Sequence, residues 1–228
     1  MLKKIMTFFT LACAAFTQSI EAHSPCSGKV DLGLAYAHID ILESGHTVKT
    51  LNMPAIKGDA TILPIPGMGI CVKPTVLYGS NDGMIFTGGV GIGHCTPITD
   101  DLILTPTAGC NFTELRAHID IPMIGLEHVK ERFRSISPYI ALEVSYKFAP
   151  CWRICGFVQY AWSHTHTKIT GLGVYKSDTK GPNYAAMIEY DLNKDWSIHL
   201  GAAYNITLSK ERHGLRGAGV KLGVARWF

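Results

Sequence analysis

The sequence GAGVKLGVARWF, residues 217–228, ends the chain and alternates apolar side chains with small or polar ones. Successive side chains of a β-strand point to opposite faces, so residues two apart share a face. The apolar side chains of this stretch fall at even positions, namely Val220, Leu222, Val224 and Phe228. The stretch therefore predicts a strand with one apolar face and one polar or open face.

The same separation of odd and even positions runs back through the chain. Even-numbered residues are apolar in successive segments, as in Met68, Ile70, Val72, Val76 and Tyr78, in Ile140, Leu142, Val144, Tyr146 and Phe148, and in Trp196, Ile198, Leu200, Ala202 and Tyr204. Their odd-numbered neighbours are mostly small or polar. A soluble β-sandwich also alternates in this way, so the pattern alone predicts an all-β chain.

Aromatic residues gather at both ends of the apolar face. One end holds Tyr146, Phe148, Trp152, Trp196 and Phe228, and the other holds Tyr36, Tyr78, Phe112, Tyr160, Trp162, Tyr184 and Tyr204. Trp152 and Trp162 are ten residues apart, which is about the length of a tilted strand that crosses hydrocarbon. We expect two membrane girdles, formed chiefly by Tyr36, Tyr78, Trp152, Tyr160, Trp162, Tyr184, Trp196 and Tyr204.

Turn lengths also alternate, as they do in outer-membrane barrels with short periplasmic turns and longer outer loops. Residues 149–151 and 193–195 are tight, whereas residues 113–137 and 164–182 are long. Nine segments have clear strand character: 29–42, 67–78, 84–95, 102–112, 138–148, 152–163, 183–192, 196–208 and 218–228. Residues 47–63 supply a tenth, because both chain ends should lie on one side. The sequence predicts a closed, antiparallel, up-and-down transmembrane β-barrel of ten strands, with eight strands as the alternative.

The first residues follow the pattern of a secretory signal peptide. Lys3 and Lys4 precede an apolar run, and Ala22 offers a small residue for cleavage. A spanning helix needs about 20 apolar residues, so cleavage is favoured over an uncleaved anchor. Cleavage is also favoured over a lipid on Cys13. We expect residues 1–22 to be removed and residues 23–228 to form one outer-membrane barrel domain.

Composition argues against nucleic acid as a partner and supports a membrane barrel. The net charge of +3 is small, and no run of Lys and Arg is interleaved with aromatics. At 47% hydrophobic and 17% charged residues the chain is apolar for a soluble protein, yet no segment after the leader is as long as a spanning helix. Its apolar residues must therefore be spread in alternation.

The leader, the barrel-sized remainder and the terminal alternation resemble the small outer-membrane β-barrel group that includes the A-, X- and W-type outer membrane proteins. The segment from Ser137 to Tyr146 is similar to a mid-chain strand of the W-type proteins. The resemblance implies location in the outer membrane of a Gram-negative bacterium, in contact with its lipid. It also implies that the barrel assembly machinery recognises the terminal strand through Val220, Leu222, Val224 and Phe228. Arg226 departs from the usual apolar residue there, although arginine can snorkel to headgroups.

The odd-numbered face is expected to line the lumen. Its polar residues include Lys73, Glu143, Gln159, Glu189, His199 and Lys221. In a narrow bore such side chains can pair with one another, because an unpaired charge is costly away from water. A plugged lumen is the leading interpretation. A narrow channel is the alternative, with the Gly89, Gly91 and Gly93 series leaving space along one wall.

Enzymatic and metal-binding interpretations find little support. His164 and His166 lie beside Ser163 at the outer rim and could serve a lipid- or peptide-modifying enzyme, or hold a metal. No third partner is visible for either role, and the pair Asp100 and Asp101 falls on the opposite side of the membrane. We therefore expect no catalytic residue, metal or cofactor.

The long loops carry many cations: Lys130, Arg132, Arg134, Lys168, Lys176, Lys180, Lys210, Arg212 and Arg216. A basic rim suits the phosphates of lipopolysaccharide or an acidic host glycan, although surface loops are generally charged. Within the largest loop, residues 125–133 are predicted as a short amphipathic helix.

Six cysteines follow the leader, an even number that permits disulfides in an oxidising compartment. The strand map places Cys26, Cys71, Cys95, Cys151 and Cys155 toward the periplasmic end. Cys151 and Cys155 cannot bridge in extended chain, where their separation would be about 13 Å. We expect some of this cluster to bridge the N-terminal segment or another envelope protein, with buried inert thiols as the alternative.

These observations favour an integral outer-membrane barrel that acts as a structural or surface-interaction protein and presents extracellular loops. A narrow channel for small solutes is the second hypothesis, and an enzyme at the rim the third.

Overall fold

The chain folds into one β-sheet. The structure is a computed structural model that describes residues 26–65, 67–121 and 126–228. Its strands are β1 (Lys29–Glu43), β2 (His46–Thr61), β3 (Ile70–Ser80), β4 (Gly83–His94), β5 (Thr96–Pro97), β6 (Leu102–Ile121), β7 (Leu126–Ala149), β8 (Trp152–Ile169), β9 (Gly173–Asp191), β10 (Trp196–Leu208) and β11 (Gly214–Trp227). No helix in the described residues is long and apolar enough to cross a membrane.

The sheet closes on itself. β1 pairs with β2 and with the last strand, β11, while β4 pairs with β3 and β6, and all these pairings are antiparallel. β5 is a two-residue stub that continues the β4 position beside β6. The described residues therefore form a barrel of ten long strands, which confirms the predicted number over eight. The tenth segment, which the sequence placed at residues 47–63, is β2.

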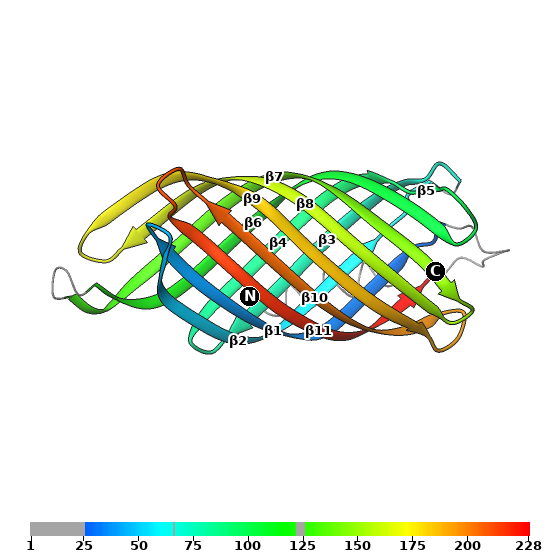
Figure 1. The fold of residues 1–228 in the computed structure, drawn as a ribbon, viewed down its shortest axis with the longest axis horizontal. Helices are drawn as coiled ribbons and strands as arrows, with labels where there is room; N and C mark the ends of the chain where they lie inside the picture. The colour runs from blue at the N-terminus through cyan, green and yellow to red at the C-terminus, as the bar shows by residue number, and fades with distance from the viewer. Residues whose placement is uncertain (1–25, 66, 122–125) are drawn as a thin grey trace.

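The barrel has two unlike ends (Figure 1). At the near end, Lys29 pairs with Trp227, so the first strand begins and the last strand ends there. At the far end, long hairpins join β1 to β2, β6 to β7, β8 to β9 and β10 to β11. β7 alone has 24 residues, whereas a tilted strand needs about 9–11 residues to cross hydrocarbon. More than half of β7 therefore lies beyond any apolar belt.

The prediction of long loops is wrong, because most of these residues form strands. Much of residues 113–137 belongs to β6 and β7, and most of residues 164–182 belongs to β8 and β9. The predicted helix over residues 125–133 is also wrong, because β7 begins at Leu126; Gly125 lies outside the described residues. The hairpins were missed because apolar residues no longer occupy the even positions there, which was the signal used to find strands.

Within the belt, the alternation has the predicted direction. Among the described residues, the exposed large apolar side chains are even-numbered apart from Ile65 and Tyr175. Leu34, Ile92 and Leu222 are the most exposed of them, at 63–71%. A soluble sandwich would bury this face, whereas here it forms the outer surface of a closed barrel.

Candidate functional site

An ionic cluster fills the near half of the barrel interior. Asp31 on β1 is buried and forms an ion pair with Lys221 on β11. The Nζ atom of Lys221 also lies 3.0 Å from Asp59 on β2. His199 Nε2 lies 3.2 Å from Asp31 Oδ2. Thr75 Oγ1 donates to Asp59 at 2.6 Å. Each charge in this cluster faces a charge of opposite sign, which is the arrangement that makes burial of charge tolerable.

A second cluster, of charged and polar side chains and Trp227, connects several strands of the wall near the described ends of the chain. Lys29 Nζ lies 2.8 Å from the fully buried Glu189, which also accepts a hydrogen bond from Ser197. The Trp227 ring is contacted by Lys29 at 4.7 Å and by Arg153 at 4.4 Å from its centroid. Trp227 Nε1 donates to Ser197 Oγ at 3.1 Å. The last residue of β11 is thus tied to strands β1, β8 and β10.

Two ion pairs cross the bore. Lys29 on β1 reaches Glu189 on β9 past β11 and β10, and Lys73 on β3 reaches Glu143 on β7 past β4 and β6. Neighbouring strands are roughly 4.8 Å apart, so three spacings amount to roughly 14 Å along the wall. Side chains so far apart on the wall meet only through the interior, and the bore is narrow at both places.

The glycine-rich wall of β4 is filled by its neighbours. A Cβ atom at Gly91 would lie 2.5 Å from the Tyr139 hydroxyl oxygen, and one at Gly93 would lie 2.6 Å from Thr107 Oγ1. Gly89 faces the Asn111 side chain in the same way. These glycines therefore admit side chains from β6 and β7, which occupy the space beside each of them.

Beyond the middle of the barrel the interior becomes apolar beside β1, β2 and β6, while polar side chains such as Ser163 and Thr165 on β8 stay buried on the other side. Buried residues from β1, β2 and β6 form one cluster there, made of Ile39, Leu51, Met53, Leu115 and Ala117. Ile41, Ile85, Phe133 and Leu215 pack against it. All of these residues are odd-numbered, so they belong to the face that is polar in the near half. We call this group the far-end core.

The outer surface of the same region is charged. Arg216 Nη2 lies 2.7 Å from Asp40 Oδ2, and Thr50 Oγ1 donates to Asp40 Oδ1 at 2.7 Å. The Thr50 hydrogen bond, with help from Arg216, holds the pKa of Asp40 below its usual range. Glu114 is contacted by three guanidinium groups, those of Arg116, Arg132 and Arg134. The two faces of β1, β2, β6 and β7 have exchanged polarity here, as expected where the surroundings change from lipid to water.

The predicted lumen residues lie inside the barrel, and the structure supplies partners that were not predicted. Lys73 and Glu143 pair with each other, but Glu189, His199 and Lys221 pair with residues outside the predicted set: Lys29, Arg153, Asp31 and Asp59. Gln159 is buried at an odd position. The missing residues are all odd-numbered polar residues, so the parity rule would have found Lys29 and Asp31 on β1, Asp59 on β2 and Arg153 on β8.

The eight predicted girdle residues all point outward. Tyr36, Tyr78, Trp152, Tyr160, Trp162, Tyr184, Trp196 and Tyr204 are each at least 37% exposed. Tyr184 lies directly opposite Tyr204, and the Trp152 ring lies 4.9 Å from that of Tyr190. Their contact with a lipid interface stays a prediction.

The predicted assembly signal lies on the outer side of the seam. Val220, Leu222 and Val224 are exposed on β11. Phe228 follows the strand and exchanges two backbone hydrogen bonds with Gly28. Recognition by an assembly machinery is untested and stays a prediction.

The geometry separates the groups of the enzymatic hypothesis. Ser163 is buried and shares a hydrogen bond of 2.7 Å with Ser137 inside the wall, whereas His164 is exposed and contacts Asp178 at 2.7 Å. A serine and a histidine on opposite faces cannot act as nucleophile and base. In the described part of the chain, no three His, Cys, Asp or Glu side chains are grouped to hold a metal ion.

One disulfide joins two of the predicted cysteines. Cys26 is bonded to Cys95, with Cα atoms 6.0 Å apart, so the segment before β1 is fixed to the end of β4. Cys71, Cys151 and Cys155 are free thiols, of which Cys71 is buried and Cys151 exposed. A pocket of about 200 Å³ lies beside the disulfide, lined in part by Met68 and His94.

No protein-family model matches the chain, and no curated protein matches it. Solved structures match its fold. The outer membrane protease OmpT from Escherichia coli is 12% identical, with a TM-score of 0.59 over 92% of this chain and 99% of that protein. An outer membrane channel from Pseudomonas putida F1 is 12% identical, with a TM-score of 0.50 over 92% of this chain and 100% of the channel. Ail, the attachment invasion locus protein of Yersinia pestis, is 10% identical, with a TM-score of 0.48 over 89% of this chain and 98% of Ail. The similarity at these identities is one of fold.

Proposed function

We propose that this chain, which has the fold of small bacterial outer-membrane β-barrel proteins, is an integral outer-membrane protein of a Gram-negative bacterium with a plugged lumen and an exposed far end. In this proposal it acts as a surface-interaction protein. The near end faces the periplasm, where the barrel assembly machinery engages β11 and the exposed Cys151 is free to bond another envelope protein.

The far-end core is the observation that carries the proposal. Leu51 and Met53 are fully inaccessible to solvent and pack inside the barrel with Leu115. An aqueous path for ions needs polar groups or water along its length, and a packed apolar cluster offers neither. Below it, the ion pairs of Lys73 and Lys29 cross the bore. Two successive obstructions of different chemistry favour a scaffold over a pore.

Planar-bilayer recording tests this proposal. The purified full-length barrel is expected to give no steady conductance steps at moderate voltage. A double variant, Leu51→Gly with Met53→Gly, would remove the largest inaccessible side chains of the far-end core and is expected to raise the frequency of openings. Stable steps from the unaltered protein would overturn the plugged-lumen proposal and favour the channel.

Protease treatment of intact cells tests the orientation. Trypsin added outside is expected to cut the far-end hairpins after Lys168 or Lys176, which are exposed near the turn between β8 and β9. Lys194, in the near-end turn between β9 and β10, is expected to be cut only after the outer membrane is opened. The reverse pattern would place the far end in the periplasm.

A further inference from the structure

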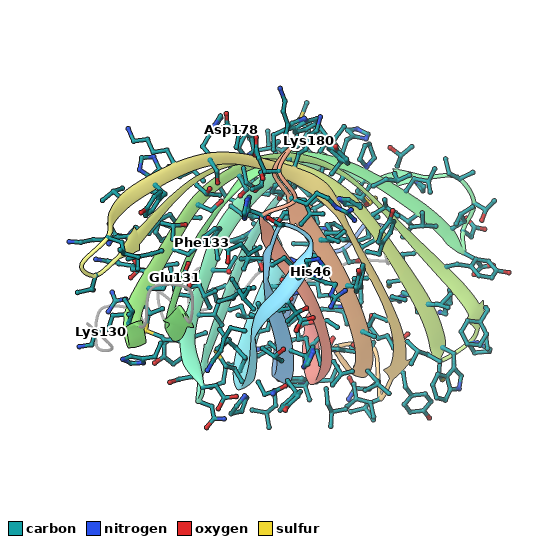
Figure 2. The ribbon with its side chains drawn as sticks, turned by 60° about the vertical axis from the view of Figure 1, so that its left-hand side comes forward. His46, Lys130, Glu131, Phe133, Asp178 and Lys180 are labelled. Atoms are coloured by element: carbon teal, nitrogen blue, oxygen red, sulfur yellow. A yellow bond between two sulfur atoms is a disulfide. The ribbon has the colours of Figure 1, made fainter. Side chains whose placement is uncertain are left out.

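A block of cationic side chains covers the outer face of β6 to β9 at the far end. Register places Arg116 opposite Arg132 and Arg132 opposite Lys168, while the next row contains Arg134, His166 and Lys176. All are even-numbered and so share the outer face of the wall. Figure 2 labels Lys130 and Phe133 on β7 and Asp178 on β9, in the two hairpins that carry these rows. We call Arg116, Arg132, Arg134, Lys168 and Lys176 the basic patch.

The positive charge of the basic patch exceeds the negative charge of the carboxylate that contacts it. Arg116, Arg132 and Arg134 all contact the carboxylate of Glu114, with Nε to oxygen distances of 2.6, 3.0 and 3.0 Å. One carboxylate neutralises one guanidinium, so the three together keep a positive excess, to which Lys168 and Lys176 add. The arginine side chains remain 39–52% exposed. Like charges held this close repel one another, so a bound anion would stabilise the arrangement.

The height of the patch identifies the kind of anion. Glu114 and Arg134 stand one side-chain step beyond the exposed Phe112 and Ile136, which mark the far edge of the apolar belt. One step along a face is roughly 6.6 Å of strand, or about 5 Å along the membrane normal at a 45° tilt. Headgroups add roughly 5–7 Å to each side of the hydrocarbon core. The row of Arg134 and Lys176 thus lies at headgroup height, and the row of Arg116, Arg132 and Lys168 stands one step, about 5 Å, above it. The exposed Ile136, Ile140 and Leu142 lie below the patch, where acyl chains would contact them.

We infer that the basic patch binds the phosphate monoesters of a lipid A headgroup in the outer leaflet. This inference rests on the proposed function in one respect, that the far end faces outward. Guanidinium groups suit phosphate because their planar fork donates two parallel hydrogen bonds. An acidic glycan from outside would meet the hairpin tips first, whereas the patch lies against the apolar belt. In this arrangement Glu114 orients the three guanidinium groups around the phosphate.

Native mass spectrometry of the detergent-solubilised full chain tests the site, with diphosphoryl lipid A as the probe. The protein is expected to retain lipid A, and the double variant Arg132→Gln with Arg134→Gln is expected to bind it about tenfold more weakly or worse. Arg132→Lys with Arg134→Lys keeps the charge and should restore part of the affinity. The control variant Lys194→Gln with Lys210→Gln removes the same charge elsewhere and should bind as the unaltered protein does.

Two further arms identify the source of the phosphate. Lipid A from which both phosphates have been removed should bind no better to the unaltered protein than to the arginine double variant. Inorganic phosphate at millimolar concentration should leave the lipid A complex in place, and its displacement of lipid A would overturn the assignment to a lipid. Equal affinity of the unaltered protein and the double variant for diphosphoryl lipid A would overturn the site itself.

The two proposals fail in different ways. Heat-modifiable migration shows first that each variant is a folded barrel. A folded barrel that conducts ions and still loses lipid A with the arginine variant would contradict the plugged lumen and leave the lipid site standing. A folded barrel that does not conduct ions, and that binds lipid A equally well with and without the two arginines, would contradict the lipid site alone.

Discussion

Two carboxylates beyond the apolar belt show how hydrogen-bond partners decide the pKa of a side chain. Asp40 receives hydrogen bonds from Thr50 and Arg216, which lower its pKa. Glu131, labelled on the far end in Figure 2, has a buried Oε2 without a hydrogen-bond partner. Burial raises the pKa of Glu131, and the carboxylate of Glu43 adds to the effect. The first carboxylate stabilises the fold when ionised, and the second destabilises it.

Replacement of Glu131 is therefore expected to stabilise the barrel in a pH-dependent way. A raised folded-state pKa means that the folded protein holds the proton more tightly than the unfolded chain, so stability falls as pH rises from the ordinary value of 4.5 through the raised one. Glu131→Gln should raise the temperature of heat-modifiable unfolding at neutral pH, and the gain should vanish at acid pH. A gain that persists unchanged in acid would show that the charge of Glu131 is not its cause.

At the scale of the strand, β1, β2, β6 and β7 each carry two opposite patterns. In β2, Ile56 points outward in the belt, while Leu51 and Met53 point inward beyond it. The period of two is kept, but the identity of the apolar face is exchanged along the same strand. Outside the hydrocarbon, water surrounds the strands and favours apolar side chains on the inside, as in a soluble protein.

Arginine substitutions on β2 test this exchange. Leu51→Arg would place a charge in the far-end core and is expected to cost several kcal/mol or prevent folding, since buried charge without a partner is among the largest single-residue effects. Val48→Arg, on the same strand but 49% exposed, should change stability by no more than about 0.5 kcal/mol. Folded fraction on unheated gels measures both, and equal effects of the two substitutions would contradict the assignment of faces.

For the whole molecule, the sequence predicted the part of the barrel that lipid constrains. Strand number, the antiparallel ring and the outward direction of the aromatic residues followed from one alternation and from the spacing of Trp152 and Trp162. The far half escaped prediction because its even positions hold Arg132 and Arg134 instead of apolar residues. The pairing of Lys29 with the predicted lumen residue Glu189 escaped because the two meet across the bore, and strand alternation does not determine which residues face each other there.

In the described part of the chain, a disulfide links two distant segments of the fold. Cys26 and Cys95 are 69 residues apart in sequence, and closing so long a loop is worth about 4 kcal/mol by the chain-entropy relation. Cys26→Ser should lower the heat-modifiable transition as much as reduction does, and reduction should have no further effect on the variant. A Cys151→Ser control should keep the full transition temperature. Indistinguishable transitions for oxidised and reduced protein would contradict a stabilising role.

The β8–β9 ribbon has a practical consequence. Its turn, near Gly171, lies nine residues beyond Trp162, roughly 20 Å above the aromatic ring at a 45° tilt. In the proposed orientation, a short epitope inserted there would stand clear of the outer leaflet and leave the spanning part of every strand unchanged. If the far end does face outward, this turn is the place at which the barrel would display a peptide to antibodies on living cells.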